Sequence, residues 1–393
     1  MTKVNRRVAI KRTLQSSAIL GLATLWQSVP SKFVLGKAER IDPSIEDSTD
    51  WVDVADWEVE GRAWRNTVKP FDRFPAKAEA VLRKAVWDLS RHSAGMVARF
   101  STDSPVVKVR YQLSSSKLAM NHMPATGVSG VDLYAETKGG EMKWINVSRP
   151  GQAIVEATLA NGIDSLPDSA TREFALYLPL YNGVQKLEIG IREGSELKPM
   201  SARKKPIVFY GTSIMQGACA SRPGMSISSI LGRRLNCSVV NLGFSGNGKM
   251  ELPVADLIGE IDPSVIAIDC LPNMNSKLVG DRAVPFVERL RKFCPQTPIL
   301  LVEDRSMTNS VFYQRSRDFH KENRASLRAA YRSLLAAGEK NIYYLDGQKL
   351  LGNDGEGATD GSHPNDLGMV RYADAYEPVL RDLMAVSGNA GTP

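Results

Sequence analysis

The sequence predicts a β-sandwich domain followed by an α/β domain with a five-stranded, doubly wound parallel sheet. Two observations support this division. Residues 51–199 contain runs in which apolar and polar residues alternate, as at Val107–Leu113 and Leu187–Ile191, and half-buried antiparallel strands require this alternation. After Pro206 the apolar runs become short and continuous and alternate with longer helical stretches, which is typical of buried parallel strands.

The first domain, which we place at residues 45–200, has frequent turn signals between its alternating runs. Thr102–Pro105, Lys138–Gly140 and Tyr181–Gly183 combine Gly, Pro, Asp and Asn, which favour tight turns. Many short strands with frequent turns favour a sandwich. We interpret the tryptophans of this domain as packing residues, although aromatic rings can also stack on sugars.

The second domain, which we place at residues 206–387, alternates strands with helices. The expected strands are Ile207–Tyr210, Val239–Leu242, Val265–Ile268, Ile299–Val302 and Ile342–Leu345. The expected helices are Ser226–Leu235, Glu251–Ile261, Arg282–Phe293, Lys321–Ala337 and Asp366–Ala385. Because ligands of open α/β sheets bind outside the carboxyl ends of the strands, the loops at these ends should converge on one crevice.

Residues 1–38 have the pattern of an export signal. Basic residues between positions 3 and 12 precede an uncharged stretch at 13–29, and small residues follow at Gly36 and Ala38. Asn5–Lys11 resembles the twin-arginine signal of bacteria, except for Ala9. The uncharged stretch is too short and weakly apolar for a convincing membrane span, although an uncleaved anchor stays an alternative. We therefore expect a periplasmic or extracellular protein without stable membrane insertion after signal removal.

The distribution of charge argues against a nucleic-acid partner. The chain has 50 Lys and Arg against 43 Asp and Glu, and residues 1–40 alone hold eight basic side chains and one acidic one. The rest of the chain therefore has 42 of each sign. A mature chain near neutrality lacks the basic surface that nucleic-acid binding requires.

The cysteines suit core packing more than a disulfide framework. They are Cys219, Cys237, Cys270 and Cys294, all in the second domain. The sequence has no CxxC motif, no HExxH motif and no local His/Cys cluster, so we expect neither a metal nor another cofactor. The oligomeric state is left open.

The expected strand ends carry the residue types that acyl transfer needs. Ser213 follows the first strand and can attack a carbonyl carbon, although a serine here could also serve only as a helix cap. His363 can take its proton, and Asp360 can hold the other imidazole nitrogen. The backbone N–H groups of Ser213 and Gly246 and the side-chain amide of Asn273 can face the developing oxyanion.

In this order, the four segments resemble the four signature blocks of the SGNH (GDSL-like) hydrolase superfamily. The matching residues are Ser213, Gly246, Asn273, and Asp360 with His363. Thr212 stands where the first block usually has Asp, and Pro272–Met274 replaces Gly-x-Asn-Asp in the third block. These departures leave the subfamily open.

Upstream, Gly130–Tyr134 resembles the Gly-x-Asp-Leu-Tyr motif of β-sandwich domains that precede such hydrolases. The resemblance implies a two-domain serine esterase acting through an acyl-enzyme, and similar enzymes often remove O-acetyl groups from sugars or polysaccharides. A lipid or aryl ester hydrolase, a thioesterase and a non-enzymatic glycan-binding protein are the alternatives. Gly243–Lys249 also fits a phosphate-binding loop, but Met250 stands where Ser or Thr must bind magnesium.

Overall fold

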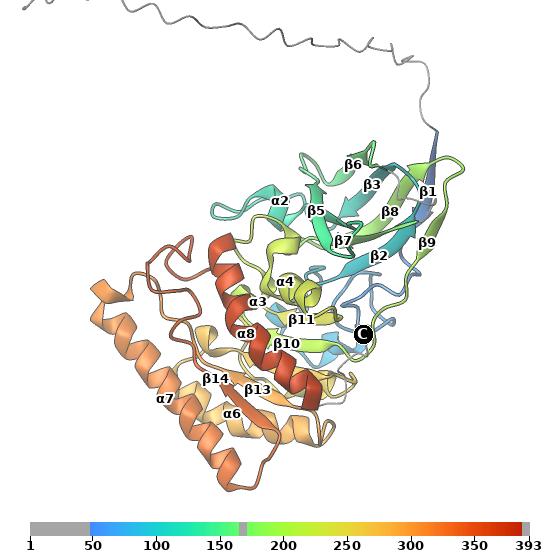
Figure 1. The fold of residues 1–393 in the computed structure, drawn as a ribbon. Coiled ribbons are helices and arrows are strands. Elements are labelled where there is room, and N and C mark those ends of the chain that lie inside the picture. The colour runs from blue at the N-terminus through green and yellow to red at the C-terminus, as the bar shows by residue number, and fades with distance from the viewer. Residues whose placement is uncertain (1–47, 165–170, 387–393) are drawn as a thin grey trace, which may run out of the picture. The chain divides into compact units, whose positions relative to one another are not determined.

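The computed structural model describes residues 48–164 and 171–386 (Figure 1). The expected export signal lies outside these residues. Within them, no helix combines the length and the apolar character needed to cross a membrane. All four cysteines are free and buried, in agreement with the interpretation as core residues.

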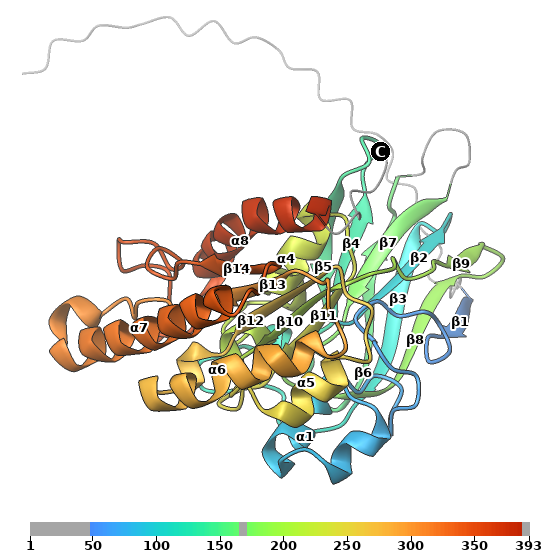
Figure 2. The same cartoon turned by 90° about the horizontal axis from the view of Figure 1, so that it is seen from below.

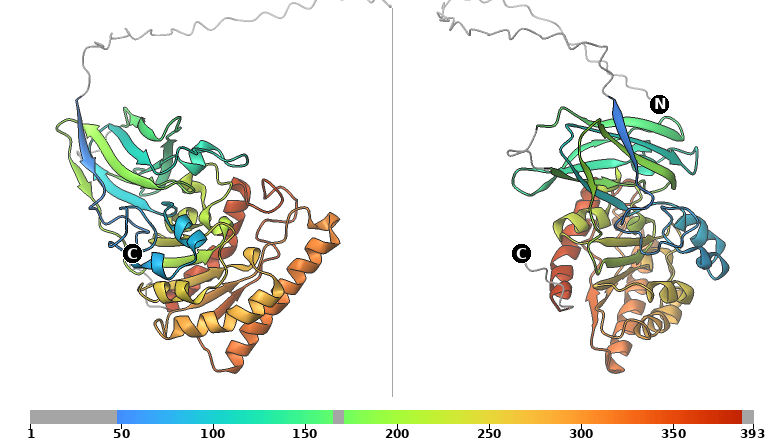
Figure 3. Two further views of the ribbon diagram at one scale, coloured as in Figure 1. Left: turned by 180° about the vertical axis from the view of Figure 1, so that it is seen from behind. Right: turned by 90° about the vertical axis from the view of Figure 1, so that its right-hand side faces the viewer.

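The first half of the chain forms two antiparallel sheets, which can be followed in Figure 3. In spatial order, one sheet contains β1 (Thr49–Asp53), β8 (Val184–Arg192), β3 (Val106–Leu113) and β6 (Ile154–Asn161). The other contains β5 (Met142–Val147), β4 (Asp132–Glu136), β7 (Arg172–Tyr177), β2 (Val97–Thr102) and β9 (Leu197–Pro199). Apolar residues of both sheets share one core, in which the Phe100 and Phe174 rings stack at 5.2 Å. The predicted β-rich first half is therefore present.

The second half contains the predicted five-stranded parallel sheet. Its spatial order is β11 (Val239–Gly243), β10 (Ile207–Gly211), β12 (Val265–Asp269), β13 (Ile299–Val302) and β14 (Ile342–Leu345). The first strand in sequence, β10, lies between the second and the third. The strand order therefore reverses at β10, and open α/β sheets bind their ligands outside the carboxyl ends of the strands at such a reversal.

Helices cover both faces of this sheet (Figure 2). On one face lie α3 (Ser213–Gln216), α4 (Ile227–Arg234) and α8 (Asp366–Val386), packed against Ile207 and Phe209. On the other lie α5 (Leu252–Ile258), α6 (Ser276–Arg291) and α7 (Gln314–Ala336), packed against Val208 and Tyr210. The short α1 (Lys84–Ser90) adds Trp87 to this second core. Alternate residues of one buried strand thus face two helical layers, which explains its continuous apolar run.

The Gly-x-Asp-Leu-Tyr segment ties the sandwich to the second domain. Asp132, fully buried at the start of β4, accepts hydrogen bonds from Arg222 Nη1 (2.8 Å), the Gly224 N–H (2.9 Å) and Trp144 Nε1 (2.7 Å). Arg222 Nη1 also lies 2.5 Å from the Tyr134 hydroxyl. A Cβ at Gly224 would lie 2.4 Å from the Tyr134 ring, so the motif and this glycine fit one another closely. The motif therefore anchors the segment that follows α3.

A second set of hydrogen bonds connects the segment between β1 and β2 to the end of β11. The Arg73 side chain is buried and donates to the carbonyl oxygens of Asn241 (3.1 Å) and Gly243 (2.6 Å). It also donates to the carbonyl oxygens of Leu89 and His92. These bonds fix the strand end from which the Gly243–Gly248 loop leaves the sheet.

Candidate active site

The turn after β10 presents Ser213 at the carboxyl edge of the sheet. Thr212 is the N-cap of α3, and its hydroxyl accepts a hydrogen bond from the Ile214 N–H (3.3 Å). Ser213 is the first residue of the helix, and its Oγ lies 2.8 Å from His363 Nε2. The alternative in which Ser213 only caps the helix is therefore wrong, since Thr212 performs the capping.

His363 and Asp360 lie in the loop before α8 and complete a hydrogen-bonded chain. His363 Nδ1 donates to Asp360 Oδ2 at 2.7 Å, and Asp360 Oδ1 accepts from the N–H groups of Ser362 (3.0 Å) and His363 (2.8 Å). Burial alone would raise the pKa of Asp360, but these hydrogen bonds lower it to about 2. Since the carboxylate is ionised at neutral pH, it holds the proton on Nδ1 and leaves the Nε2 lone pair facing Ser213.

A buried arginine holds this loop in place. Arg305 is 2% exposed and pairs with Asp304, while its Nε donates to the Ser362 carbonyl oxygen (3.3 Å) and its Nη2 to the Ser362 hydroxyl. In addition, the Thr308 N–H donates to the Gly361 carbonyl oxygen (2.9 Å). The segment after β13 thus supports Gly361 and Ser362, the two residues between Asp360 and His363.

The Gly243–Gly248 loop places Gly246 in an unusual backbone conformation. Gly246 has a φ of +70°, which L side chains rarely adopt, and no atom lies within 4 Å of where its Cβ would be. The N–H of Ser245 donates to Gln216 Oε1 (3.0 Å), and that of Phe244 donates to the Gly211 carbonyl oxygen (3.0 Å). Across the described part of the chain, the Gly246 N–H meets no acceptor. It is available for an oxyanion.

Asn273 is oriented by the same loop. Its Oδ1 accepts a hydrogen bond from the Gly248 N–H (3.2 Å), and its Nδ2 finds no acceptor among residues 48–164 and 171–386. A Cβ at Gly248 would lie 2.1 Å from the Gly211 oxygen and 3.1 Å from the Thr212 nitrogen. Gly248 must therefore be glycine, because it packs directly against the backbone that leads into Ser213. Through Gly248, Asn273 is thus connected to the turn that carries Ser213.

Gln216, which the sequence analysis did not single out, links the sandwich to the Gly243–Gly248 loop. Besides accepting from Ser245, its side chain donates to the Leu180 carbonyl oxygen (3.1 Å) and to His92 Nδ1 (3.0 Å). Burial, followed by the nearby Arg73 charge, lowers the pKa of His92 to about 3, so this imidazole is a neutral acceptor. Residues of the first domain thus hold α3, the helix that begins at Ser213.

His122 lies beside His363, in a loop of the first domain that is rich in turn residues. Its ring lies 5.8 Å from the His363 ring, and the Cys219 thiol donates to its carbonyl oxygen at 3.5 Å. Burial raises the pKa of Cys219 to about 11, so the thiol is protonated. Metal-ligating atoms of His122, Cys219 and His363 all lie within 4.8 Å of one another.

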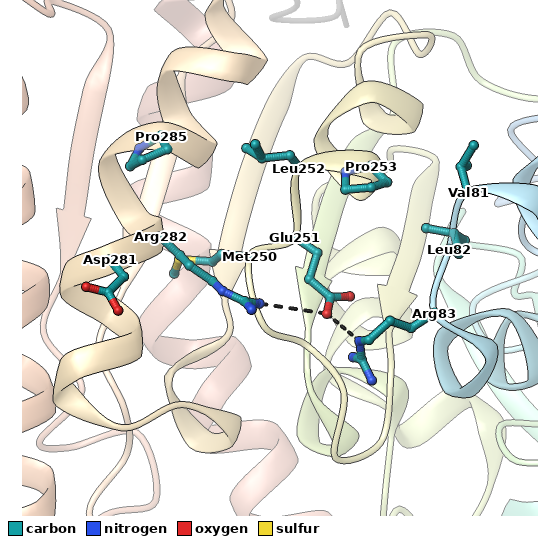
Figure 4. Close-up of a pocket in the computed structure, with 10 residues that line it drawn as sticks. All are labelled: Val81, Leu82, Arg83, Met250, Glu251, Leu252, Pro253, Asp281, Arg282 and Pro285. Carbon is teal, nitrogen blue, oxygen red and sulfur yellow. Dashed lines mark hydrogen bonds and ion pairs between the residues drawn. The ribbon is translucent and has the colours of Figure 1, made fainter.

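A separate cavity of about 410 Å³ lies between α6 and the segment before α1 (Figure 4). Its apolar wall includes Leu82 and Met250, and its Glu251 carboxylate pairs with Arg83 and lies 3.7 Å from Arg282. None of the residues that line it belongs to the Ser213–His363 pair. Its charges are already paired, so it offers no second candidate for catalysis.

Comparison with known proteins identifies the family. Residues 204–381 match the GDSL-like Lipase/Acylhydrolase family, and residues 49–197 match the N-terminus of SGNH-hydrolase-type esterases, named GxDLY. No protein of curated function matches significantly.

Among solved structures, a protein assigned to the GDSL-like lipases from Bacteroides ovatus shares 32% identity over 86% of this chain and 98% of its own, with a TM-score of 0.81. The salicylyl-acyltransferase SsfX3 of a tetracycline biosynthetic pathway has 20% identity over 88% and 99%, with a TM-score of 0.67. An acetyl xylan esterase from Butyrivibrio proteoclasticus has 12% identity over 86% and 99%, with a TM-score of 0.53. The last two likenesses concern the fold alone. The resemblance seen in the sequence is confirmed, and the chain belongs to the GDSL-like lipase/acylhydrolase family as an SGNH-type ester hydrolase.

Proposed function

We propose that this esterase is exported and removes small acyl groups, specifically O-acetyl groups on a sugar or polysaccharide, through an acyl-enzyme on Ser213. The observation that carries the proposal is the continuous chain from Ser213 Oγ through His363 to Asp360, with distances of 2.8 and 2.7 Å. The acetyl xylan esterase among the structures of similar fold supports the choice of acyl group and of alcohol. Export rests on the sequence pattern of residues 1–38.

The proposed reaction begins when His363 Nε2 takes the Ser213 hydroxyl proton while Oγ attacks the ester carbonyl carbon. The carbonyl oxygen becomes an oxyanion, and the N–H groups of Ser213 and Gly246 and the amide of Asn273 stabilise it. The imidazolium, which ionised Asp360 stabilises, then gives its proton to the departing alcohol oxygen.

The second half of the reaction repeats these roles with water as the nucleophile. His363 takes a proton from water, whose oxygen attacks the acyl carbon attached to Ser213. The second tetrahedral intermediate collapses, the proton returns to Ser213 Oγ, and the carboxylic acid leaves. The same donors stabilise both oxyanions.

The sandwich loop beside His363 supports a preference for short acyl groups. His122 lies against the His363 ring, and Met123 is buried in the core that also contains Ile214 and Met215. This loop therefore forms a wall on the side of the site that the first domain covers. Because this wall lies next to His363, it leaves less room for a long acyl chain.

The proposal is tested with a panel of esters of graded acyl length. We expect kcat/KM to be highest for acetyl esters, to fall with chain length, and to be high on acetylated xylo-oligosaccharides. Replacing both His122 and Met123 by Ala should raise the ratio of long-chain to acetyl kcat/KM, because specificity is differential binding of the transition state. A wild-type preference for long acyl chains or for thioesters would instead support the lipid esterase or thioesterase alternatives.

A further inference from the structure

We infer that His122, Cys219 and His363 form a site for a zinc-type divalent ion, and that an ion bound there switches the esterase off. The three residues come from a sandwich loop, from the turn after α3 and from the loop before α8, and their ligating atoms lie within 4.8 Å of one another. Two imidazole nitrogens and one thiolate are the ligand types that Zn²⁺ prefers.

Both imidazoles have an oxygen partner on Nδ1, as metal-ligating histidines usually do. His363 Nδ1 donates to the Asp360 carboxylate (2.7 Å), and His122 Nδ1 lies 2.7 Å from Asn121 Oδ1, an amide oxygen that can only accept. In each ring the proton is thus held on Nδ1, and the Nε2 lone pair is left to coordinate. Oxygen partners that fix the tautomer in this way are the usual support of histidine ligands.

The cysteine is held at this position by an unusual backbone. Cys219 has a φ of +67°, in the left-handed region that few residues other than glycine adopt, and it follows Gly217 at +106°. Its thiol lies against the His122 carbonyl oxygen, only 7% of the residue being exposed. Strained backbone of this kind persists where the surrounding structure imposes it. Here it keeps a sulfur beside two imidazoles.

The distances leave room for coordination after a small adjustment. Bonds of about 2.0–2.3 Å in a tetrahedral site separate the ligand atoms by roughly 3.5 Å, so the donors must close by up to about 1.3 Å. Ion binding would release the thiol proton to solvent, while both imidazoles keep their Nδ1 protons. A water molecule or Ser213 Oγ would complete the tetrahedron.

Coordination and catalysis compete for the same pair of electrons. The Nε2 lone pair of His363 faces the Ser213 hydroxyl at 2.8 Å and is needed to accept its proton. An ion bound to this lone pair removes the base and occupies the place of the ester carbonyl. Inhibition should therefore be complete at saturation and reversible when the ion is removed. This consequence for activity rests on the proposed function, whereas ion binding itself does not.

The first experiment measures inhibition. Hydrolysis of p-nitrophenyl acetate is followed over a range of free Zn²⁺ concentrations, and each curve is scaled to that variant's own metal-free rate. We expect wild-type activity to disappear and to return with EDTA, and Mg²⁺, which prefers oxygen ligands, to have no effect. Cys219→Ser should raise the half-inhibiting Zn²⁺ concentration at least tenfold, and Cys294→Ser, which changes another buried free thiol, should not. Equal sensitivity of wild type and Cys219→Ser would overturn the inference.

The second experiment detects the bound ion by its absorption in the Ser213→Ala variant, so it does not depend on ester hydrolysis. Titration with Co²⁺ should produce thiolate-to-cobalt absorption that saturates at one equivalent. The band should be lost when Cys219→Ser is added and weakened when His122→Ala is added. If Ser213→Ala kept full activity, the proposed function would fail while this titration would still report the site. A Co²⁺ spectrum without a thiolate band would overturn the site and leave the proposed function untouched.

Discussion

Replacing Gln216 by Leu should separate the role of the sandwich contacts in catalysis from their role in stability. The Gln216 side chain is buried and makes three hydrogen bonds, to the Ser245 N–H (3.0 Å), the Leu180 carbonyl oxygen (3.1 Å) and His92 Nδ1 (3.0 Å). Leucine has a similar size but can make none of them. The substitution therefore leaves three buried or half-buried polar groups without their partner.

The expected loss of stability follows from these three bonds. A typical intramolecular hydrogen bond contributes about 1 kcal/mol, and a buried group left unsatisfied costs about 1–3 kcal/mol. We expect the free energy of unfolding to fall by about 3–5 kcal/mol. The Ser245 N–H also loses the acceptor that positions the Ser245–Gly246 peptide. Loss of one oxyanion donor lowers kcat by about 10²–10³, so a displaced Gly246 should lower it by roughly 10–100-fold with little change in KM.

Asn182 provides a matched control in the sandwich. It is also buried and makes three hydrogen bonds, with the Ser115 N–H (3.1 Å), the Ser115 carbonyl oxygen (2.9 Å) and the Ser129 hydroxyl (3.1 Å). Asn182→Leu should lose comparable stability and keep its kcat. Urea unfolding and steady-state kinetics on both variants, at a temperature where both are folded, make the comparison. If Gln216→Leu were as active as Asn182→Leu, the link from the sandwich to the oxyanion donors would be refuted.

The remaining predictions concern the oxyanion donor, a buried acid and export. Asn273→Ala should lower kcat by about 10²–10³ with little change in KM, whereas a lower melting temperature with normal kinetics would indicate a purely structural asparagine. Burial raises the pKa of Asp269 to about 7 against a partly opposing hydrogen bond from Tyr376, so the native state keeps this proton while the unfolded chain loses it near pH 4. The contribution of Asp269 to the free energy of unfolding should thus fall as pH rises from about 4 to 7 and then level off. Urea unfolding at pH 5 and pH 8 measures this fall, which should be absent in Asp269→Asn. An equal pH dependence of stability in the wild type and in Asp269→Asn would contradict the raised pKa of Asp269. Replacing both Arg6 and Arg7, which lie outside the described residues, by Lys should retain the precursor in the cytoplasm. Unaffected export would point to the general secretory route.

The strands of the second domain were predictable because each is a short apolar run buried on both faces. All five lie within one residue of their expected bounds. The helix starts were less predictable: α6 begins at Ser276 instead of Arg282, and α7 at Gln314 instead of Lys321. The first turn of α7 is largely exposed and carries no apolar residue, whereas the apolar period of α6 already begins at Val279, before the expected start. The Asn275 side chain caps α6 by accepting from the Leu278 N–H at 2.9 Å, a signal that the periodicity alone does not contain.

The sequence also pointed to the residues of the Ser213–His363–Asp360 chain, because four weak motifs follow expected strand ends in one order. Their catalytic roles stay predictions. Gln216 and Arg305 could not be found in this way, because each is a single polar residue without a local motif. The partner of Gln216 in the sandwich, His92, lies 124 positions away, and Arg305 lies 57 positions from Ser362. Such support becomes visible only in the folded chain, within the second domain for Arg305 and between the two domains for Gln216.

The central claim is that Ser213 is the nucleophile, and covalent labelling tests it most directly. A fluorophosphonate probe should modify the wild-type protein at one equivalent, and mass spectrometry of the digested protein should place the label on Ser213. Ser213→Ala should fold normally, take up no label and lose about 10⁴-fold or more in kcat. Labelling of another residue, or an alanine variant that still hydrolyses esters at the wild-type rate, would contradict the account.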